Sequence, residues 1–313
     1  MFGAQLYNVG TSWDEITSVL RVMEAGTWTS AYVYDHFVPP LGGRAVELRP
    51  NLEGWMLLGG MAAVTTGLEL GALVSGNTYR NPALLAKMAV TLDEVSKGRA
   101  ILGIGAGWHA REHEAYGWDF PSLAERSDRL EEACQLIRML FHAGPQELVN
   151  YEGKYYQLTE APFVPNHYRG AGPRGRKRQD AIPIMVGGKG RKRTLKTLAQ
   201  YGDIMNVISS PEEFKQECEV LDRHCEAVGR DPAEISRTVH IPLRIMDDEQ
   251  TAKELRADDD WKPIGSVQRV IDKCGDFIAA GVEEFCFAGI PQHPAVYQRL
   301  NEEVLPAFSR GLL

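Results

Sequence analysis

The sequence lacks the marks of several large protein classes. Its five cysteines are odd in number, widely spaced and without a C-x-x-C pair, which argues against a disulfide scaffold or a zinc ribbon. Basic residues are in the minority, with 34 Lys and Arg against 42 Asp and Glu, a net charge of −8. Because a general nucleic-acid binder needs a basic face, we expect a small-molecule substrate and no nucleic-acid partner.

Export and membrane signals are missing as well. The opening residues, MFGAQLYNVG, have neither a basic region nor a long apolar run, and together with reduced cysteines they favour a cytoplasmic location. A long apolar stretch, residues 55–76, contains Glu69, two threonines and several glycines. Because its periodicity changes midway, we interpret it as a buried helix followed by a buried strand, with no membrane partner.

Short apolar runs alternate with longer segments of helical spacing. Capping signals precede several of the helical segments, at Ser12 to Glu15, Asn81-Pro82, Ser122 to Glu125 and Ser210 to Glu213. The eight expected strands are 2–8, 30–37, 68–76, 99–107, 182–188, 203–209, 239–246 and 283–289. Eight such units predict an α/β fold, a (β/α)8 TIM barrel. A doubly wound open sheet is the alternative, because periodicity does not show closure.

Two stretches interrupt this rhythm. Residues 143–181, which follow the expected fourth helix, are predicted to be an irregular insertion, and they include the basic tract 169–180. A smaller irregular stretch is predicted over residues 247–263. No linker divides the chain, so we expect a single domain over residues 1–313.

The active site of a TIM barrel is built at the C-terminal ends of the strands. The candidate residues at those ends are Tyr7, Asp35, His36, Ser75, Asn77, Gly105, Ala106, Gly107, Trp108, His109, Gly187, Gly188, Lys189, Gly190 and Arg191. Tyr7, Trp108 and His109 are the expected substrate contacts, His36 is the expected catalytic residue, and the others are expected to bind a cofactor.

His36 is chosen because an imidazole exchanges protons near neutral pH. The alternative is a structural histidine that is hydrogen-bonded to the backbone. Asp35 is a candidate to orient the imidazole, although neighbouring strand residues point to opposite faces.

Two glycine-rich strand ends suggest contacts with a cofactor. In Gly187-Gly-Lys-Gly190, followed by three more basic residues, backbone N–H groups, a helix start and cations all favour a phosphate. A solvated basic helix start is the alternative. In Gly103-Ile-Gly105-Ala-Gly107, small residues let a flat ring lie against the backbone, and tight packing is the alternative. Neither segment matches a Walker A loop or a dinucleotide fingerprint.

A third motif, His109-Ala-Arg-Glu112-His113, has the spacing of zinc ligands on one helical face. A catalytic zinc needs a third ligand, and no downstream acidic partner stands out. We therefore favour a capping and packing role for His113, and we expect no metal.

Five segments together resemble the bacterial luciferase-like superfamily of TIM-barrel enzymes, and most closely its coenzyme F420-dependent oxidoreductases. They are AYVYDHF at 31–37, residues 75–117 from SGNTYRNP to HEAYG, ERSDRLEEACQLIRMLF at 125–141, YEGKYYQL at 151–158 and IPIMVGGKGRKRTLKTLAQYGD at 182–203. The resemblance implies that His36 contacts the deazaflavin and acts as acid or base. It also implies a non-proline cis peptide at Leu73-Val74 behind the cofactor ring, and a cofactor phosphate at Gly187 to Arg191.

The resemblance leaves the substrate and the choice of cofactor open. The sugar-phosphate dehydrogenases of the family carry an acidic residue where Trp108 stands here, so we expect a more apolar or aromatic substrate. Two basic tracts, 174–178 and 189–193, suit the acidic tail of F420 and favour it over FMN. The expected reaction is hydride transfer between F420 and an organic substrate.

Other activities and an oligomeric state are compatible with the sequence. FMN would instead make the protein a monooxygenase that uses reduced flavin and oxygen. A non-enzymatic flavin-binding barrel is a less favoured alternative. A Schiff-base aldolase would have Lys189 as its candidate lysine. Members of the superfamily are often dimers, so a homodimer is expected.

Overall fold

The computed structural model describes residues 1–40, 43–168 and 181–309. Eight parallel strands close into a barrel in the order β1-β12-β9-β8-β7-β4-β3-β2. The TIM-barrel prediction is therefore confirmed, and the open sheet is excluded. The barrel strands are β1 Phe2–Leu6, β2 Ser30–Asp35, β3 Glu69–Gly76, β4 Ala100–Gly105, β7 Ile184–Gly187, β8 Ile204–Val207, β9 Ser236–Pro242 and β12 Glu284–Ala288.

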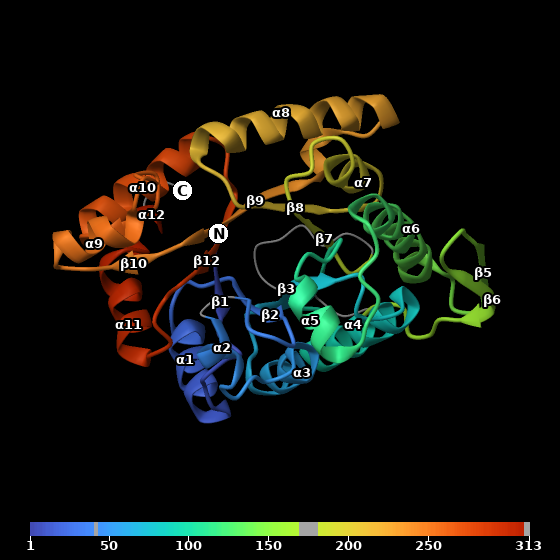
Figure 1. The fold of residues 1–313 in the computed structure, drawn as a ribbon, viewed down its shortest axis with the longest axis horizontal. Helices are drawn as coiled ribbons and strands as arrows, with labels where there is room; N and C mark the ends of the chain where they lie inside the picture. The colour runs from blue at the N-terminus through green and yellow to red at the C-terminus, as the bar shows by residue number, and fades with distance from the viewer. Residues whose placement is uncertain (41–42, 169–180, 310–313) are drawn as a thin grey trace.

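Helices surround the strands on all sides (Figure 1). The predicted side-chain caps are present: Ser12 forms a capping box with Glu15, and Asn81, Ser122 and Ser210 each accept a backbone N–H. The helices are α1 Trp13–Ala25, α2 Gly43–Glu47, α3 Gly54–Val64, α4 Pro82–Ser96, α5 Ala110–Tyr116, α6 Leu123–His142, α7 Thr194–Tyr201, α8 Pro211–Val228, η1 Pro232–Glu234, α9 Glu249–Arg256, α10 Val267–Ala279, α11 Pro294–Glu303 and α12 Pro306–Ser309.

The long apolar stretch forms α3 and β3, as expected. No helix of the described ranges combines the length and the apolar character that a membrane crossing requires. The five cysteines are all free thiols in the interior.

Several predicted boundaries were wrong. The strand expected over 99–107 ends at Gly105, because the apolar and glycine-rich pattern continues past the hydrogen-bonded ladder into the rim loop. The strand expected over 239–246 begins at Ser236 and ends at Pro242. The residues after it form β10 Arg244–Ile245, which pairs with β11 Ile264–Gly265 outside the barrel.

The two stretches expected to be irregular contain regular structure. Within 143–181, β5 Leu148–Glu152 and β6 Gln157–Pro162 form an antiparallel hairpin that lies outside α6 (Figure 1). The hairpin has few buried side chains, so its hydrophobic pattern is weak. Within 247–263, Asp248 caps the short helix α9. The basic tract 169–180, including 174–178, lies outside the described residues.

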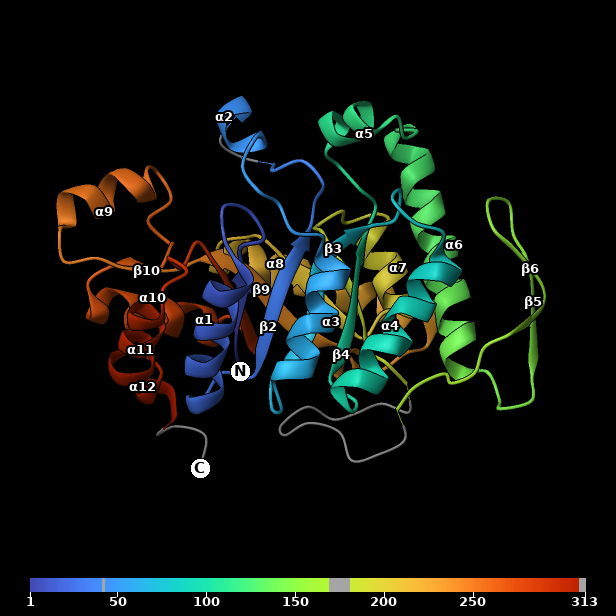
Figure 2. The ribbon, with the colours of Figure 1, turned by 90° about the horizontal axis from the view of Figure 1, so that it is seen from below.

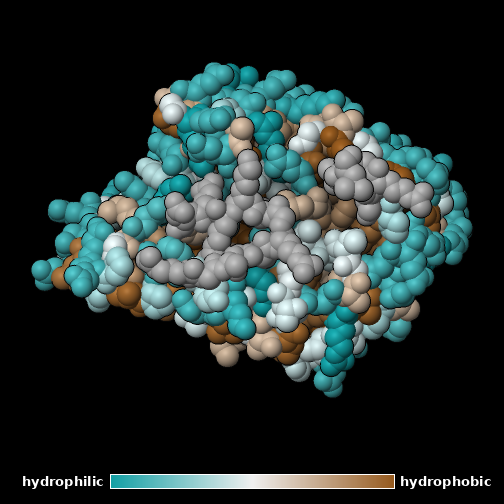
Figure 3. Space-filling view, turned by 180° about the vertical axis from the view of Figure 1, so that it is seen from behind, coloured by the Kyte–Doolittle hydropathy of each residue, from teal (hydrophilic) through white to brown (hydrophobic). Residues whose placement is uncertain are grey.

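The core has two layers. A large cluster fills the space between strands and helices, and a small one fills the barrel interior with Tyr32, Leu73, Ile101, Met185, Ile204 and Cys286. At the opposite end from the strand C-termini, the buried Glu284 carboxylate accepts hydrogen bonds from Ser30 Oγ at 2.6 Å and Tyr32 Oη at 3.2 Å. This end of the molecule is mostly hydrophilic around its visible edge (Figure 3).

The strand C-termini all reach one rim, where α2 and α5 project beyond the strands (Figure 2). Helix α5 follows β4, and α2 lies in the connection after β2. Polar residues at the strand ends and side chains of the short helices α2 and α5 therefore lie at the same end of the barrel.

Close packing of β3 and β4 requires glycine at position 103. A Cβ on Gly103 would lie 2.0 Å from the Ala72 carbonyl oxygen, so the strands would have to separate. For Gly103, tight packing is the reason for glycine.

We expect Gly103→Ala to destabilise the fold by about 1–3 kcal/mol, because a methyl group is forced into a filled space. Gly59→Ala is the matched control, since no atom lies within 4 Å of its added Cβ; it should stabilise α3 by about 0.5–1 kcal/mol. Urea unfolding of the three proteins measures both changes. Equal stability of Gly103→Ala and the wild-type protein would contradict the packing argument.

Candidate active site at the barrel rim

The rim brings together three of the predicted residues. His36 follows β2, and Trp108 and His109 follow β4. The Trp108 and His109 rings lie edge-on to the His36 ring, with centroid distances of 5.6 and 5.7 Å. The Trp108 side chain is 61% exposed, whereas that of His36 is 13% exposed. The imidazole is thus enclosed on two sides and retains a small opening toward the rim.

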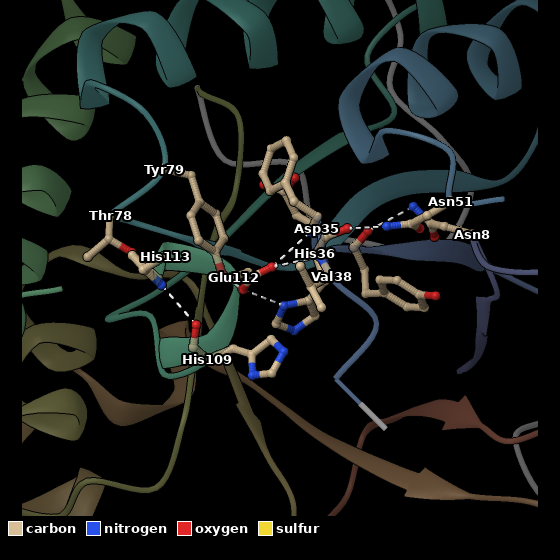
Figure 4. Close-up of polar contacts among 12 residues, drawn as sticks. Asn8, Asp35, His36, Val38, Asn51, Thr78, Tyr79, His109, Glu112 and His113 are labelled. Atoms are coloured by element: carbon tan, nitrogen blue, oxygen red, sulfur yellow. Dashed lines mark hydrogen bonds and ion pairs between the residues drawn. The ribbon is translucent and has the colours of Figure 1, made fainter. Parts of the chain in front are cut away.

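Glu112 is a site residue to which the sequence analysis assigned no role. It lies on α5 with 0% of its surface exposed, and its Oε1 lies 2.8 Å from His36 Nδ1. Oε1 also accepts the Tyr79 hydroxyl, and Oε2 accepts the Phe37 N–H at 2.8 Å. Figure 4 shows Glu112 between Tyr79 and His36. Glu112 is part of the His109-to-His113 motif, which the sequence analysis considered only as a set of zinc ligands. The motif does not indicate that its carboxylate pairs with a residue 76 positions away.

These contacts govern the charges of the site. Burial raises the pKa of Glu112, but the hydrogen bonds from His36 and Tyr79 outweigh it, so the pKa lies below its ordinary value. Burial and the bond to Glu112 raise the pKa of Tyr79, and burial lowers the pKa of His109. At neutral pH the site therefore contains one carboxylate, one phenol and a neutral His109.

The other motif residue, His113, has a packing role. It is 1% exposed, its Nε2 lies 2.7 Å from Thr78 Oγ1, and its Nδ1 lies 2.9 Å from the His109 carbonyl oxygen. Over residues 1–40, 43–168 and 181–309, no group of three or more His, Cys, Asp or Glu side chains is arranged to hold a metal ion.

Asp35 does not orient the imidazole, because its side chain points to the other face of β2. It is 1% exposed and binds Arg80 through both oxygens, at 2.5 and 3.0 Å. Arg80 also bonds Glu53 at 2.6 Å. Asp35 thus belongs to an ion-pair cluster beneath the rim. The carboxylate that contacts the His36 imidazole is that of Glu112.

The strand ends beside the site are rich in glycine and closely packed. The cis peptide implied by the resemblance is present at Leu73-Val74. The Val74 methyl groups would lie within 3.0 Å of a Cβ added to Gly105 or Gly187. Gly107 has a φ of +79°, and a Cβ there would meet Thr78 Oγ1 at 2.6 Å. A side chain at these three positions would therefore collide with neighbouring protein atoms, which favours tight packing as the explanation for the glycines.

Ser75 and Asn77, the predicted site residues at the end of β3, differ in what their side chains contact. Ser75 is 0% exposed and accepts the Trp55 indole N–H at 2.9 Å, so its side chain supports the rim from outside. Asn77 donates its amide to the Tyr156 hydroxyl of the β5–β6 hairpin at 3.1 Å. Its Oδ1 is buried and has no hydrogen-bond partner within the part of the chain that the structure describes, so Asn77 has an acceptor to offer.

The basic loop after β7 is held by helix α8, which supplies both of its carboxylate partners. Lys189 Nζ lies 3.4 Å from Glu213, and Arg191 bonds the buried Glu217 at 3.1 Å. The N–H of Gly188 donates to the Asn206 carbonyl oxygen. Both cations remain about half exposed, at 53% and 49%, so they can also reach an anion above the loop.

Tyr7 and Ala106 complete the set of predicted residues. Tyr7 follows β1, and its backbone N–H donates to Gln292 Oε1 at 2.7 Å. Ala106 follows β4 and is partly buried against the main core. Both are therefore rim residues, as expected from the barrel.

The fold and the site together define a class: a (β/α)8 barrel with a carboxylate-bound imidazole and glycine-rich strand ends at its mouth. A family model described as luciferase-like monooxygenase matches residues 2–284. The chain belongs to this luciferase-like family.

Curated relatives include an F420-dependent glucose-6-phosphate dehydrogenase from Kineococcus radiotolerans, 34% identical over 242 residues. A phthiodiolone/phenolphthiodiolone dimycocerosates ketoreductase from Mycobacterium bovis is 35% identical over 243 residues. Each match covers 75% of this chain, but only 64% and 56% of the respective relative. The chain thus spans less than two thirds of the length of these relatives.

Solved structures share the fold. An F420-dependent secondary alcohol dehydrogenase in complex with an F420-acetone adduct has a TM-score of 0.81 at 19% identity, with 98% of each chain covered. An EDTA monooxygenase from Chelativorans has a TM-score of 0.79 at 14% identity, covering 99% of this chain and 94% of that one. At these identities the likeness shows the barrel alone.

We expect Arg80→Met to destabilise the protein by about 3–5 kcal/mol, because it leaves the Asp35 carboxylate buried and unpaired. Arg111→Met is the matched control on the same rim, since it breaks a half-exposed contact with Glu47 at 3.4 Å; it should cost about 0–1 kcal/mol. Urea unfolding distinguishes the two. Similar effects for both variants would contradict the structural role of the Asp35–Arg80 pair.

Proposed function

We propose that this protein is an F420-dependent oxidoreductase that transfers a hydride between the deazaflavin and a carbonyl or unsaturated carbon of a small organic substrate. The carrying observation is the His36 imidazole, which is fixed at the barrel mouth by the buried Glu112 carboxylate. The two curated relatives are an F420-dependent dehydrogenase and a ketoreductase by name, which supports oxidoreduction.

The residues at the mouth fit a planar ring that carries a phosphate. A Cβ added to Gly105, Gly107 or Gly187 would meet Val74 or Thr78, so these strand ends remain free of side chains of their own, and Asn77 Oδ1 is a buried acceptor without a partner among the described residues. The half-exposed Lys189 and Arg191 suit an anion. We propose that Leu73, Val74, Gly105 and Gly107 support the ring, and that Gly187 to Arg191 hold the phosphate.

When bound, the deazaflavin supplies the hydride acceptor or donor. The protein supplies the proton transfer: His36 takes a proton from a substrate hydroxyl in the oxidative direction and gives one to a substrate oxygen in the reductive direction. Trp108 and His109 restrict water around His36 and present ring surfaces to the substrate. An apolar or aromatic substrate suits the exposed Trp108 indole.

FMN is the competing cofactor, and the similarity to monooxygenases favours it. The family model carries the description monooxygenase, and an EDTA monooxygenase shares the fold. With FMN the protein would be a flavin monooxygenase. A homodimer in the cytoplasm stays a prediction for either cofactor.

Titration of the purified protein with F420 and, in parallel, with FMN tests the proposal. We expect saturable binding of F420, followed by fluorescence, and markedly weaker binding of FMN. Tight binding of FMN alone would point to the monooxygenase, and binding of neither would remove the cofactor assignment.

Charge variants locate the phosphate in the same titration. Arg191→Met should weaken F420 binding by roughly 10- to 100-fold, the effect of losing one charge-assisted hydrogen bond. Lys215→Met on α8 is the matched control and should leave the affinity unchanged. Equal affinities for both variants would place the phosphate elsewhere.

His36→Asn tests the proton transfer. We expect kcat to fall by about 10²–10⁴-fold, the usual contribution of a general acid or base, while the Kd for F420 stays close to that of the wild-type protein. His142→Asn, on the exposed end of α6, is the control. Stopped-flow absorbance of the deazaflavin measures the rate, and a wild-type kcat for His36→Asn would rule out this role.

A further inference from the structure

The two oxygens of the Glu112 carboxylate have different tasks. Oε2 accepts the backbone N–H groups of Phe37 at 2.8 Å and Val38 at 3.3 Å. Oε1 faces His36 Nδ1 at 2.8 Å and the Tyr79 hydroxyl. Because two backbone N–H groups can only donate, Oε2 must be an acceptor and the orientation of the carboxyl group is fixed.

The surroundings favour the ionised carboxylate. It is completely buried, accepts from the backbone and from a phenol, and lies 2.8 Å from an imidazole nitrogen, and hydrogen bonds to the charged form lower the pKa of a carboxyl. An ionised carboxylate has no proton to donate. The contact at 2.8 Å therefore requires a proton on His36 Nδ1.

We propose that Glu112 is a positioning residue that keeps the proton of the neutral His36 ring on Nδ1 and so leaves Nε2 as the atom that exchanges a proton with the substrate. This inference rests on the proposed function for the identity of the reaction, but not for the tautomer. In the oxidative direction the substrate alcohol loses a hydride to the cofactor and its hydroxyl proton to Nε2. In the reductive direction Nε2 returns that proton to the oxygen of the carbonyl.

The other titratable groups near the pair do not compete for Nδ1. His113 is hydrogen-bonded to Thr78 and to the His109 carbonyl, and Asp35 is paired with Arg80. His109 approaches the His36 ring edge-on, with no hydrogen bond between the two rings within the described residues. Tyr79 bonds Glu112, so Glu112 alone sets the proton position on Nδ1.

The effect of Glu112→Gln can be predicted, because the backbone N–H groups fix the orientation of the glutamine amide. The carbonyl oxygen of the glutamine must face the N–H groups of Phe37 and Val38. Its NH2 group then faces His36 Nδ1 and donates to it, which places the ring proton on Nε2. The volume is preserved, and the tautomer is reversed.

The tautomer is measurable in the protein without cofactor or substrate. In ¹⁵N-histidine NMR spectra at a pH where the ring is neutral, the wild-type protein should show a pyrrole-like Nδ1 and a pyridine-like Nε2 for His36. Glu112→Gln should show the reverse. The spectrum of His36→Asn identifies the His36 signals among the eight histidines.

Two control variants separate position from charge. Glu114→Gln removes the same charge from an exposed site on α5 and should leave the tautomer on Nδ1. Tyr79→Phe should also leave it there, because the Glu112 contact remains. A proton on Nε2 in the wild-type spectrum alone overturns the proposal, even if Glu112→Gln does not fold; so does an unchanged tautomer in Glu112→Gln, or a reversed one in Tyr79→Phe.

Kinetics test the same variant independently of the spectra. Glu112→Gln should lower kcat by about 100-fold or more, in line with the loss of a general acid–base step, with the Kd for F420 unchanged. A wild-type kcat overturns the inference. If F420 does not bind the wild-type protein, the proposed function fails, while the NMR result still decides the tautomer.

Discussion

The structure of the site depends on one constraint: a buried carboxylate has to find hydrogen-bond donors for both of its oxygens. Glu112 meets this constraint with donors from the end of β2 and from the β3–α4 connection. It thereby fixes α5 relative to two strands of the barrel. The same bonds that stabilise the charge place the His36 ring, so the architecture of the rim and the orientation of its imidazole have a common cause.

The carboxylate of Asp35 has a structural role that differs from the role of its neighbour His36. Asp35 and His36 are neighbours on one strand end, and the alternation of side chains sends them to opposite faces. Asp35 pairs with Arg80 beneath the rim and supports the fold. His36 faces the mouth and meets Glu112. Adjacent polar residues therefore have unrelated functions, and only the pleat of the strand distinguishes them.

The glycines of β4 show that one motif can satisfy two requirements. Gly103 is needed because β3 approaches to within a carbonyl contact, which is packing alone. A Cβ on Gly105 would meet Val74, while Gly107, in the loop after β4, has a φ of +79° and a Cβ there would meet Thr78 Oγ1. The motif therefore serves close packing within the strand and a left-handed backbone in the loop that follows it.

Local and periodic features of the fold could be predicted from the sequence. The caps at Ser12, Asn81, Ser122 and Ser210 depend on neighbours within three residues, and each of the eight strands contains a short apolar run. The β5–β6 hairpin and α9 were missed, because they bury little surface and so have only weak hydrophobic periodicity. The strand ends were placed too far along the chain, since apolar residues continue into the loops of the rim.

The sequence by itself determined the number and order of the strand–helix units, the rim position of His36, Trp108 and His109, and the glycine-rich ends of the fourth and fifth units. Only the tertiary structure decided that the sheet closes and that Glu112, rather than Asp35, holds the imidazole. Periodicity records which face of an element is buried. It does not record which buried carboxylate meets which ring across 76 residues, because that pairing depends on the order β2-β3-β4 in the sheet, which places the end of β2 near the helix α5 that follows β4.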